Sequence, residues 1–134
     1  MTKAEHILSE LIQSVEGTTE ASSISYVMKK SQGAAYAIEH QAGGTNRANE
    51  ATGLVVEALR QQMPTSKLIQ PVILRIRTNS KIPLLMRELE TITEGIQAIV
   101  GRKPSQFLYL QDDKGQSGDQ LMLSLVYWLK DIDL

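Results

Sequence analysis

Few residues in this chain have the types and spacing that enzyme chemistry requires. The 134 residues contain two histidines and no cysteine, which excludes a thiol nucleophile, a disulfide and a cysteine-ligated metal. Neither His6 nor His40 is accompanied by a serine nucleophile elbow, so a hydrolase triad would have no nucleophile. A small enzyme that uses His40 together with Asp112 or Asp119 is the least favoured of three hypotheses.

The 112–120 loop, DDKGQSGDQ, brings three aspartates together. A calcium loop needs oxygen ligands at alternating positions and a closing glutamate. Here Lys114 and Gly115 stand at ligand positions, and Leu123 stands at the closing position. We therefore interpret this loop as the solvated tip of a hairpin, and we predict no metal site.

The 43–47 segment, Gly-Gly-Thr-Asn-Arg, has the glycines of a phosphate-binding loop but not its other features. It lacks the Gly-Lys-Ser/Thr ending and the preceding apolar strand of a P-loop. A flexible loop followed by a helix cap explains the segment better. The sequence therefore predicts no bound cofactor.

Arg75 and Arg77 are the charges whose spacing is most informative. In a strand, Val72, Leu74 and Ile76 would face the core, and both arginines would share the opposite face. That face is either solvated or a contact between subunits, since arginine pairs bidentately with carboxylates and suits interfaces. The candidate partners are aspartates of a neighbouring subunit, namely Asp112, Asp113, Asp131 or Asp133.

The final apolar run, LMLSLVYWLK at 121–130, has no polar face. Only Ser124 interrupts its apolar residues, whereas a half-buried strand alternates apolar and polar residues. The run is either a central strand covered by helices on both sides or a subunit contact. The candidate subunit interface therefore consists of Arg75, Arg77, Asp112, Asp113, Tyr127 and Trp128.

Composition narrows the choice of partners. The formal net charge is −1 and aromatic residues make up 4% of the chain, whereas nucleic-acid binding usually requires a basic surface or several aromatic stacking platforms. No segment approaches the roughly 20 consecutive apolar residues of a membrane span. Glu5 and Glu10 interrupt the first apolar stretch, so we expect no secretory signal. We predict no specific nucleic-acid binding, no membrane contact and one domain over residues 1–134.

The beginning of the chain predicts a helix followed by a strand. A capping box precedes apolar residues at helical spacing, which predicts a helix over 3–16. The small polar residues of 17–23 predict a loop. Alternation of Ile24, Tyr26 and Met28 with more polar residues predicts a half-buried strand over 24–29.

The next segment is open to two interpretations. Residues 34–41 alternate as in a second strand, with a hairpin turn at 30–33, although their alanines suit a helix equally well. We favour the strand. Asn46 or Asn49 can cap a following helix, which Pro64 ends.

The second half is expected to form a strand, a helix and two more strands. Residues 67–78 read as a strand, with Pro71 at its start or on a sheet edge. Ser80 can cap a helix that ends at Gly101. Two apolar runs, 107–110 and 121–132, flank the polar loop and predict a long-looped hairpin.

The whole pattern predicts an α+β fold with the element order α-(β-β)-α-β-α-β-β. A single mixed or antiparallel sheet would be packed by two to three helices, mainly on one face. The length gives room for a substantial core without metal or disulfide support.

Residues 68–130 resemble the tail terminator, or minor capsid (tail completion), proteins of long-tailed bacteriophages. The resemblance lies in VILRIRTNS, in the Leu/Ile face of LLMRELETITEGI and in the final strand LMLSLVYWL. It implies a structural virion protein, assembled in the host cytoplasm, that forms a ring expected to be a hexamer. The ring would cap the tail tube, contact the tail tube protein and the head completion protein, and join head to tail without catalysis.

A second hypothesis needs no virion. The chain could be a dimeric α+β adaptor, chaperone or regulatory binding module that lacks catalysis and uses the leucine-rich final strand as its interface. A stable two-fold dimer without affinity for phage tails would favour this alternative.

Overall fold

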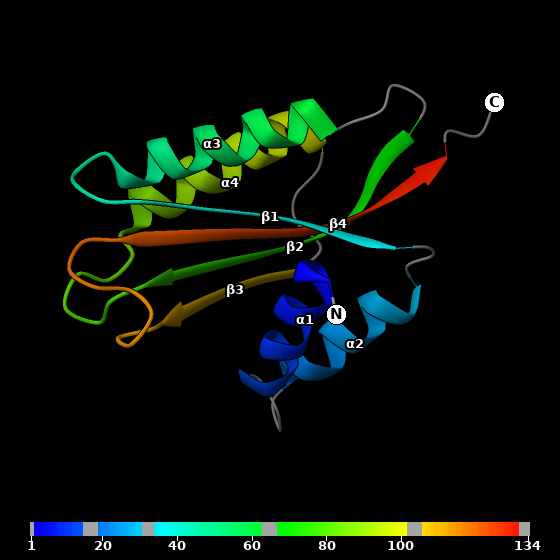
Figure 1. Cartoon of the computed structure of the whole chain (residues 1–134), viewed down its shortest axis with the longest axis horizontal. Coiled ribbons are helices and arrows are strands. Elements are labelled where there is room, and N and C mark those ends of the chain that lie inside the picture. The colour runs from blue at the N-terminus through cyan, green and yellow to red at the C-terminus, as the bar shows by residue number, and fades with distance from the viewer. Residues whose placement is uncertain (1, 15–18, 31–33, 63–66, 102–105, 132–134) are drawn as a thin grey trace.

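The computed structural model describes residues 2–14, 19–30, 34–62, 67–101 and 106–131. The elements follow one another as an α+β chain with a single open, mixed, four-stranded sheet. In order they are α1 (Lys3–Ser14), α2 (Thr19–Lys30), β1 (Ala35–Ala42), α3 (Arg47–Gln62), β2 (Lys67–Thr78), α4 (Met86–Val100), β3 (Gln106–Gln111) and β4 (Leu121–Asp131). Figure 1 shows three layers, with α3 and α4 on one side of the sheet and α1 and α2 on the other.

The sheet has the strand order β1-β4-β2-β3. Strand β4 pairs antiparallel with both β1 and β2, whereas β3 pairs parallel with β2. The final strand is therefore central, with helices over both faces, which explains why its two faces are both apolar. A register shift between Ile69 and Val72 surrounds Pro71, because proline has no amide hydrogen to donate to β4.

The α3/α4 face of the sheet holds the larger apolar core. Fully buried residues of β2, β4, α3 and α4 meet there, among them Leu74, Ile76, Leu123, Leu125, Val55, Leu59, Ile92 and Ile96. The two helices approach closely at one point. A Cβ atom added to Gly95 of α4 would lie 2.5 Å from the Thr52 methyl group of α3, so only glycine fits there.

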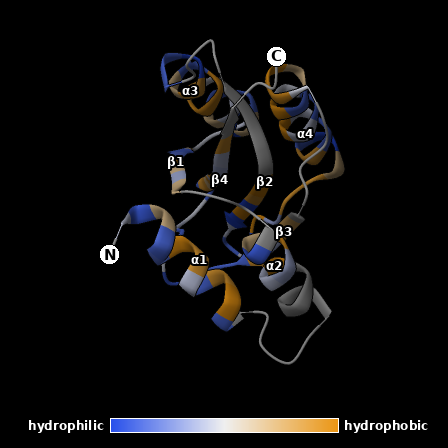
Figure 2. Cartoon of the chain, turned by 90° about the vertical axis from the view of Figure 1, so that its right-hand side faces the viewer, coloured by the Kyte–Doolittle hydropathy of each residue, from blue (hydrophilic) through white to orange (hydrophobic). Residues whose placement is uncertain are grey.

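The α1/α2 face holds a smaller core. Ile7, Leu8 and Leu11 of α1 pack with Ile73, Val126 and Trp128 of the sheet, and Ile24 and Val27 of α2 join them. Figure 2 shows that α1, α3 and α4 each carry both apolar and hydrophilic residues, as amphipathic cover helices do. Among the described residues, no helix is long and apolar enough to cross a membrane.

The predicted strand over 24–29 is wrong, because these residues belong to helix α2. Ile24 and Val27 are buried three positions apart, as on one helix face, while Tyr26 is 63% exposed. Ile24, Tyr26 and Met28 fit a period of two, whereas Ile24, Val27 and Met28 fit a period of 3.6, and packing against the sheet selected the helix. The expected loop at 17–23 is also wrong from Thr19 onward. Residues 31–33 of the expected turn lie outside the described residues.

Of the other predictions about the fold, some are confirmed and some are wrong. The α+β class, the mixed sheet and the strand at 34–41 are confirmed, but helices cover both faces and four of them are described. The predicted β3–β4 hairpin is wrong, since β2 lies between these strands. Ser80 does not cap α4, which begins at Met86 with Leu85 in the cap position.

Candidate functional site

Three loops meet at one end of the sheet, where β1, β2 and β3 end. They comprise residues 43–46, 79–85 and 112–120, and Figure 1 shows them together beyond the strand ends. Asp119 accepts a hydrogen bond from the amide of Gly44, at 2.9 Å, and Gly44 has a φ of +91° that favours glycine. Asp113 accepts bonds from the amide and hydroxyl of Ser80, at 2.6 and 2.7 Å. The acidic loop therefore fastens its neighbours.

Arg75 lies on the α1 face of the sheet and is only 2% exposed. Its guanidinium donates to Glu39 of β1, at 3.2 Å, and to the hydroxyl of Ser124, at 3.3 Å. Glu10 of α1 lies 3.7 Å away at ion-pair distance. The side chain is thus enclosed between the sheet and α1, and its carboxylate partners belong to the same chain.

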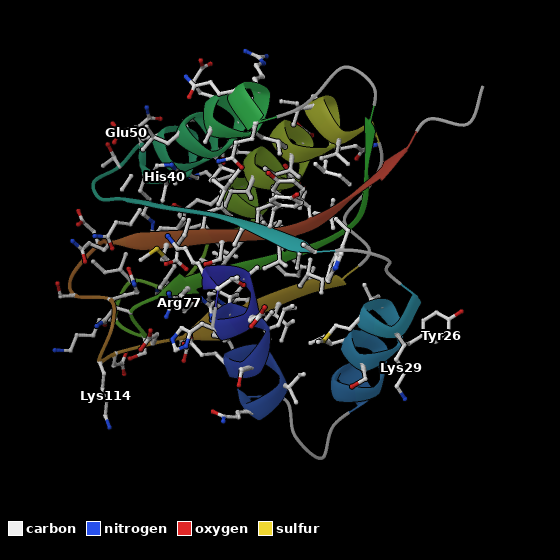
Figure 3. All side chains as sticks on the ribbon, turned by 45° about the vertical axis from the view of Figure 1, so that its right-hand side comes forward. Tyr26, Lys29, His40, Glu50, Arg77 and Lys114 are labelled. Carbon is white, nitrogen blue, oxygen red and sulfur yellow. The ribbon has the colours of Figure 1, made fainter. Side chains whose placement is uncertain are left out.

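Arg77 extends this polar row toward the loops. It lies 3.5 Å from Glu39 and donates to Asp112 at 3.2 Å, and its side chain is 16% exposed. Figure 3 shows Arg77 on the side of the sheet that α1 covers. Ser124 in turn donates to Glu39 at 2.6 Å. Within the described residues, the Nε atoms of Arg75 and Arg77 are buried without a hydrogen-bond partner.

The electrostatics of this row follow from burial and from charge pairing. Burial, helped by the neighbouring charge of Arg77, lowers the pKa of Arg75. Burial opposes ionisation of Glu39, but the Ser124 hydrogen bond and the two guanidinium groups outweigh it. They hold the pKa of Glu39 below its usual value. The row is therefore a set of ion pairs that fixes β1, β2 and α1.

The six residues of the candidate subunit interface do not form one surface. Tyr127 is 1% exposed, stacks on Tyr36 with ring centroids 5.6 Å apart and donates to Gln62 at 2.6 Å. Trp128 is buried under α1 and α2. Asp112 pairs with Arg77, and Asp113 is exposed. The structure thus gives most of these residues partners within the chain, and their role as subunit contacts stays a prediction.

The structure holds one buried ion pair that sequence reasoning missed. Arg47, at the start of α3, donates to both carboxylate oxygens of Glu88 in α4, at 2.7 and 2.9 Å. It also donates to the carbonyl oxygens of Ile82, Pro83 and Asp119, at 3.2, 3.1 and 3.1 Å. Glu88 stands in the apolar row of its helix between Leu84, Leu85 and Ile92. A charged residue within this apolar row was the sequence signal from which a buried ion pair could have been predicted.

Each member of this pair strengthens the ionisation of the other. The hydrogen bond from Arg47 lowers the pKa of Glu88 despite burial, and the bond to Glu88 raises the pKa of Arg47. Glu88 also accepts the amide of Leu85 at 3.0 Å. The pair therefore anchors the backbone that leads into α4.

The segment anchored in this way exposes apolar side chains. Ile82, Leu85 and Met86 are 42%, 45% and 70% exposed, and we call them the 82–86 surface. Their backbone is fixed on both sides: the amide of Ile82 donates to Asn79, at 3.1 Å, and the amide of Leu84 to the Tyr109 hydroxyl, at 3.0 Å. The 82–86 surface is therefore an exposed apolar segment whose backbone is held by hydrogen bonds and which leads into α4.

The residues suited to catalysis are not brought together. No hydrogen bond or ion pair joins His40 to Asp112 or Asp119 within the described part of the chain, and no cluster there could hold a metal ion. His6 lies 3.3 Å from Glu10 on the outside of α1. In the described part of the chain, the residues that the enzyme hypothesis requires therefore do not form a catalytic group.

Comparison with known proteins finds likeness only among solved structures. No family model and no curated protein match the chain. A point mutant of FtsZ from M. jannaschii superposes with a TM-score of 0.62 and 12% identity, covering 80% of this chain and 31% of that one. An FtsZ dimer of the same organism superposes with a TM-score of 0.54 and 11% identity, covering 84% of this chain and 36% of that one. CetZ from Methanosaeta thermophila superposes with a TM-score of 0.54 and 14% identity, covering 89% of this chain and 34% of that one.

At these identities the likeness concerns the fold alone, and the chain spans about a third of the length of these structures. The expected membership of the phage tail terminator family is wrong, because the fold is similar to that of FtsZ and CetZ. These come from cellular organisms and are not virion components. The ring that caps a tail tube, its tail and head partners and the virion location are withdrawn with it. The sequence pattern behind that resemblance occurs in many small α+β folds.

One of the similar structures is described as a dimer. This is compatible with self-association of the present chain.

Proposed function

We propose that this chain is a non-catalytic assembly module that associates with further copies of itself. The observation that carries the proposal is the 82–86 surface, where large apolar side chains stand exposed at the base of α4. Neighbouring exposed hydrophobic residues of this kind are typical of protein contact sites. Methionine adapts its shape to a partner surface more readily than branched residues do.

The fixed backbone beneath this surface favours binding. Five hydrogen bonds from Arg47 hold Glu88, two carbonyl groups of the segment and the carbonyl of Asp119. Association costs free energy when flexible loops must be ordered, and a segment that is already ordered avoids this cost. A buried ion pair that supports exposed apolar side chains is well suited to presenting a contact surface.

The absence of catalysis is supported by how the polar groups are used. The carboxylates of Asp112, Asp113 and Asp119 fasten Arg77, Ser80 and Gly44 respectively. Arg75 and Glu39 pair with each other. These groups therefore hold the fold together, and within the described residues no hydrogen bond or ion pair joins His40 to any of them.

Sedimentation velocity of the full 134-residue chain over a wide concentration range tests the proposal. We expect the wild type to associate and Met86→Ser to weaken the association about 10- to 100-fold. This is the effect of removing roughly 1.5–3 kcal/mol of apolar burial. The matched control is Tyr26→Ser, because Tyr26 is also strongly exposed but projects from α2 on the far side of the sheet (Figure 3).

Tyr26→Ser should associate as the wild type does. A wild type that stays monomeric at the highest attainable concentration would contradict the proposal. So would an equal loss of association in both variants, because the apolar contact would then not be specific to the 82–86 surface.

A further inference from the structure

The 82–86 surface has a positive charge at each end. Lys81 precedes it and Arg87 follows it, and both side chains are exposed. Within the described residues neither cation has a carboxylate at ion-pair distance. The carboxylate of Asp113 accepts hydrogen bonds from the amide and the hydroxyl of Ser80, and the nearby charge of Lys81 helps to lower its pKa. A partner that covers the apolar centre would therefore also meet two exposed cations.

The outer side of α3 carries the opposite arrangement. Four exposed residues spaced by four, three and four positions form a single stripe along the helix, which we call the α3 stripe. They are Glu50, Leu54, Glu57 and Gln61. Leu54 is 47% exposed and has a carboxylate on each side along the stripe. Figure 3 shows Glu50 projecting outward from α3.

The carboxylates of the α3 stripe are only loosely engaged. Glu57 lies 4.0 Å from Arg60 and 3.5 Å from Gln61, and both distances are at the limit of a direct interaction. Glu50 has no ion pair within the described part of the chain. The stripe therefore offers an apolar side chain between two anions, the complement of an apolar surface between two cations.

Gly53, next to Leu54, is a second and independent sign of a contact. A glycine inside a helix destabilises it relative to alanine. Apart from the adjoining residues and the nearby backbone of α3 itself, no atom of the described chain lies within 4 Å of the position that a Cβ would take at Gly53, and its φ is not positive. Packing within the chain therefore does not require this glycine, whereas close approach of another surface would.

We infer that the α3 stripe of one copy receives the 82–86 surface of another copy, with Lys81 and Arg87 facing Glu50 and Glu57. The inference rests on the proposed function and names the partner surface that self-association uses. Complementary charge around an apolar centre gives such a contact its register and its partner choice. The occupant is a second copy of this chain, because the chain itself carries the complementary surface.

A pair of charge reversals tests the inference. The variants K81E/R87E and E50K/E57K each place like charges across the contact, and each should associate about tenfold or more weakly than the wild type. When the two variants are mixed, opposite charges face each other again, and association should return as a mixed complex. Sedimentation velocity with one variant fluorescently labelled measures both effects, and circular dichroism checks the folding of each variant.

The control is K3E/K29E, which changes net charge by the same amount as K81E/R87E. Lys3 of α1 and Lys29 of α2 lie on the opposite side of the sheet from α3 and α4 (Figure 1), so this variant should associate as the wild type does. If the wild type associates but the reversals do not weaken it, or the mixture does not recover, the inference is overturned while the proposed function stands. If the wild type does not associate, both are overturned.

Discussion

The two faces of the sheet use buried arginine in different ways. On the α3/α4 face, Arg47 stands at the rim of a continuous apolar core, and each of its guanidinium nitrogens has at least one partner. On the α1/α2 face, Arg75 stands within the sheet surface itself, with a buried Nε that has no partner among the described residues. Both side chains are 3% exposed or less.

The difference indicates what each charge does. A buried ion pair stabilises only when its hydrogen bonds compensate the loss of hydration. Arg47 meets this condition and organises a loop. Arg75 meets it less well, and it shares Glu39 with Arg77 and Ser124. We infer that the α3/α4 face contributes more to stability, and that the polar row beside the smaller apolar core under α1 tolerates change.

The largest effect is expected from Arg47→Met. The substitution leaves Glu88 buried without its cation and frees three backbone carbonyl groups, so the free energy of unfolding should fall by about 3–5 kcal/mol. Urea denaturation followed by circular dichroism at pH 7 measures this loss. The control Arg60→Met removes an arginine from the same helix that is 67% exposed, and should change stability by less than about 0.5 kcal/mol.

Arg75→Met should be milder and would sharpen the comparison. Glu39 keeps Arg77 and Ser124 after the substitution, so we expect a loss of about 1–2 kcal/mol by the same denaturation experiment. The methionine side chain also fills most of the vacated volume. A loss as large as that of Arg47→Met would show that the two faces depend equally on their arginines.

The smallest effect concerns the pH dependence of stability. Because the folded state lowers the pKa of Glu88 and Glu39 below their usual 4.5, the unfolded state binds more protons in acid. Their stabilisation is therefore complete above about pH 4.5 and is lost as the pH falls through the lower folded values. Glu88→Gln should be less stable than the wild type at pH 7 and should lose less on acidification. An acid dependence as steep as that of the wild type would count against this role of Glu88.

Much of the fold could be predicted from local sequence patterns. The amphipathic rows of α1, α3 and α4 and the strand alternation in 34–41 and 67–78 were sufficient, because each element buries one regular face. Helix α2 was not recognised because Ile24, Tyr26 and Met28 fit the period of a strand, while Ile24, Val27 and Met28 fit the period of a helix equally well. The neighbours of β3 were not predictable either, since pairing with β2 rather than β4 depends on contacts distant in sequence.

The site was predicted less well, for a related reason. The spacing of Arg75 and Arg77 placed them correctly on the sheet face opposite the α3/α4 core, but nothing in the spacing shows that α1 covers that face. Arg47 was interpreted as part of a polar loop, although Glu88 in an apolar helix row indicated a buried cation nearby. The exposure of Met86 depends on where α4 begins. The sequence predicted a start capped by Ser80, whereas the helix begins at Met86.

The central position of β4 has a consequence for folding. This strand follows all the other described strands in the sequence, yet β1 pairs only with it, from Ala35 opposite Trp128 to Ala42 opposite Leu121. During synthesis, β1 has no hydrogen-bonded neighbour in the sheet until the ribosome has released the residues of β4. Such late, long-range closure slows folding and leaves early strands exposed. The nascent chain therefore has most need of protection by chaperones just before β4 emerges.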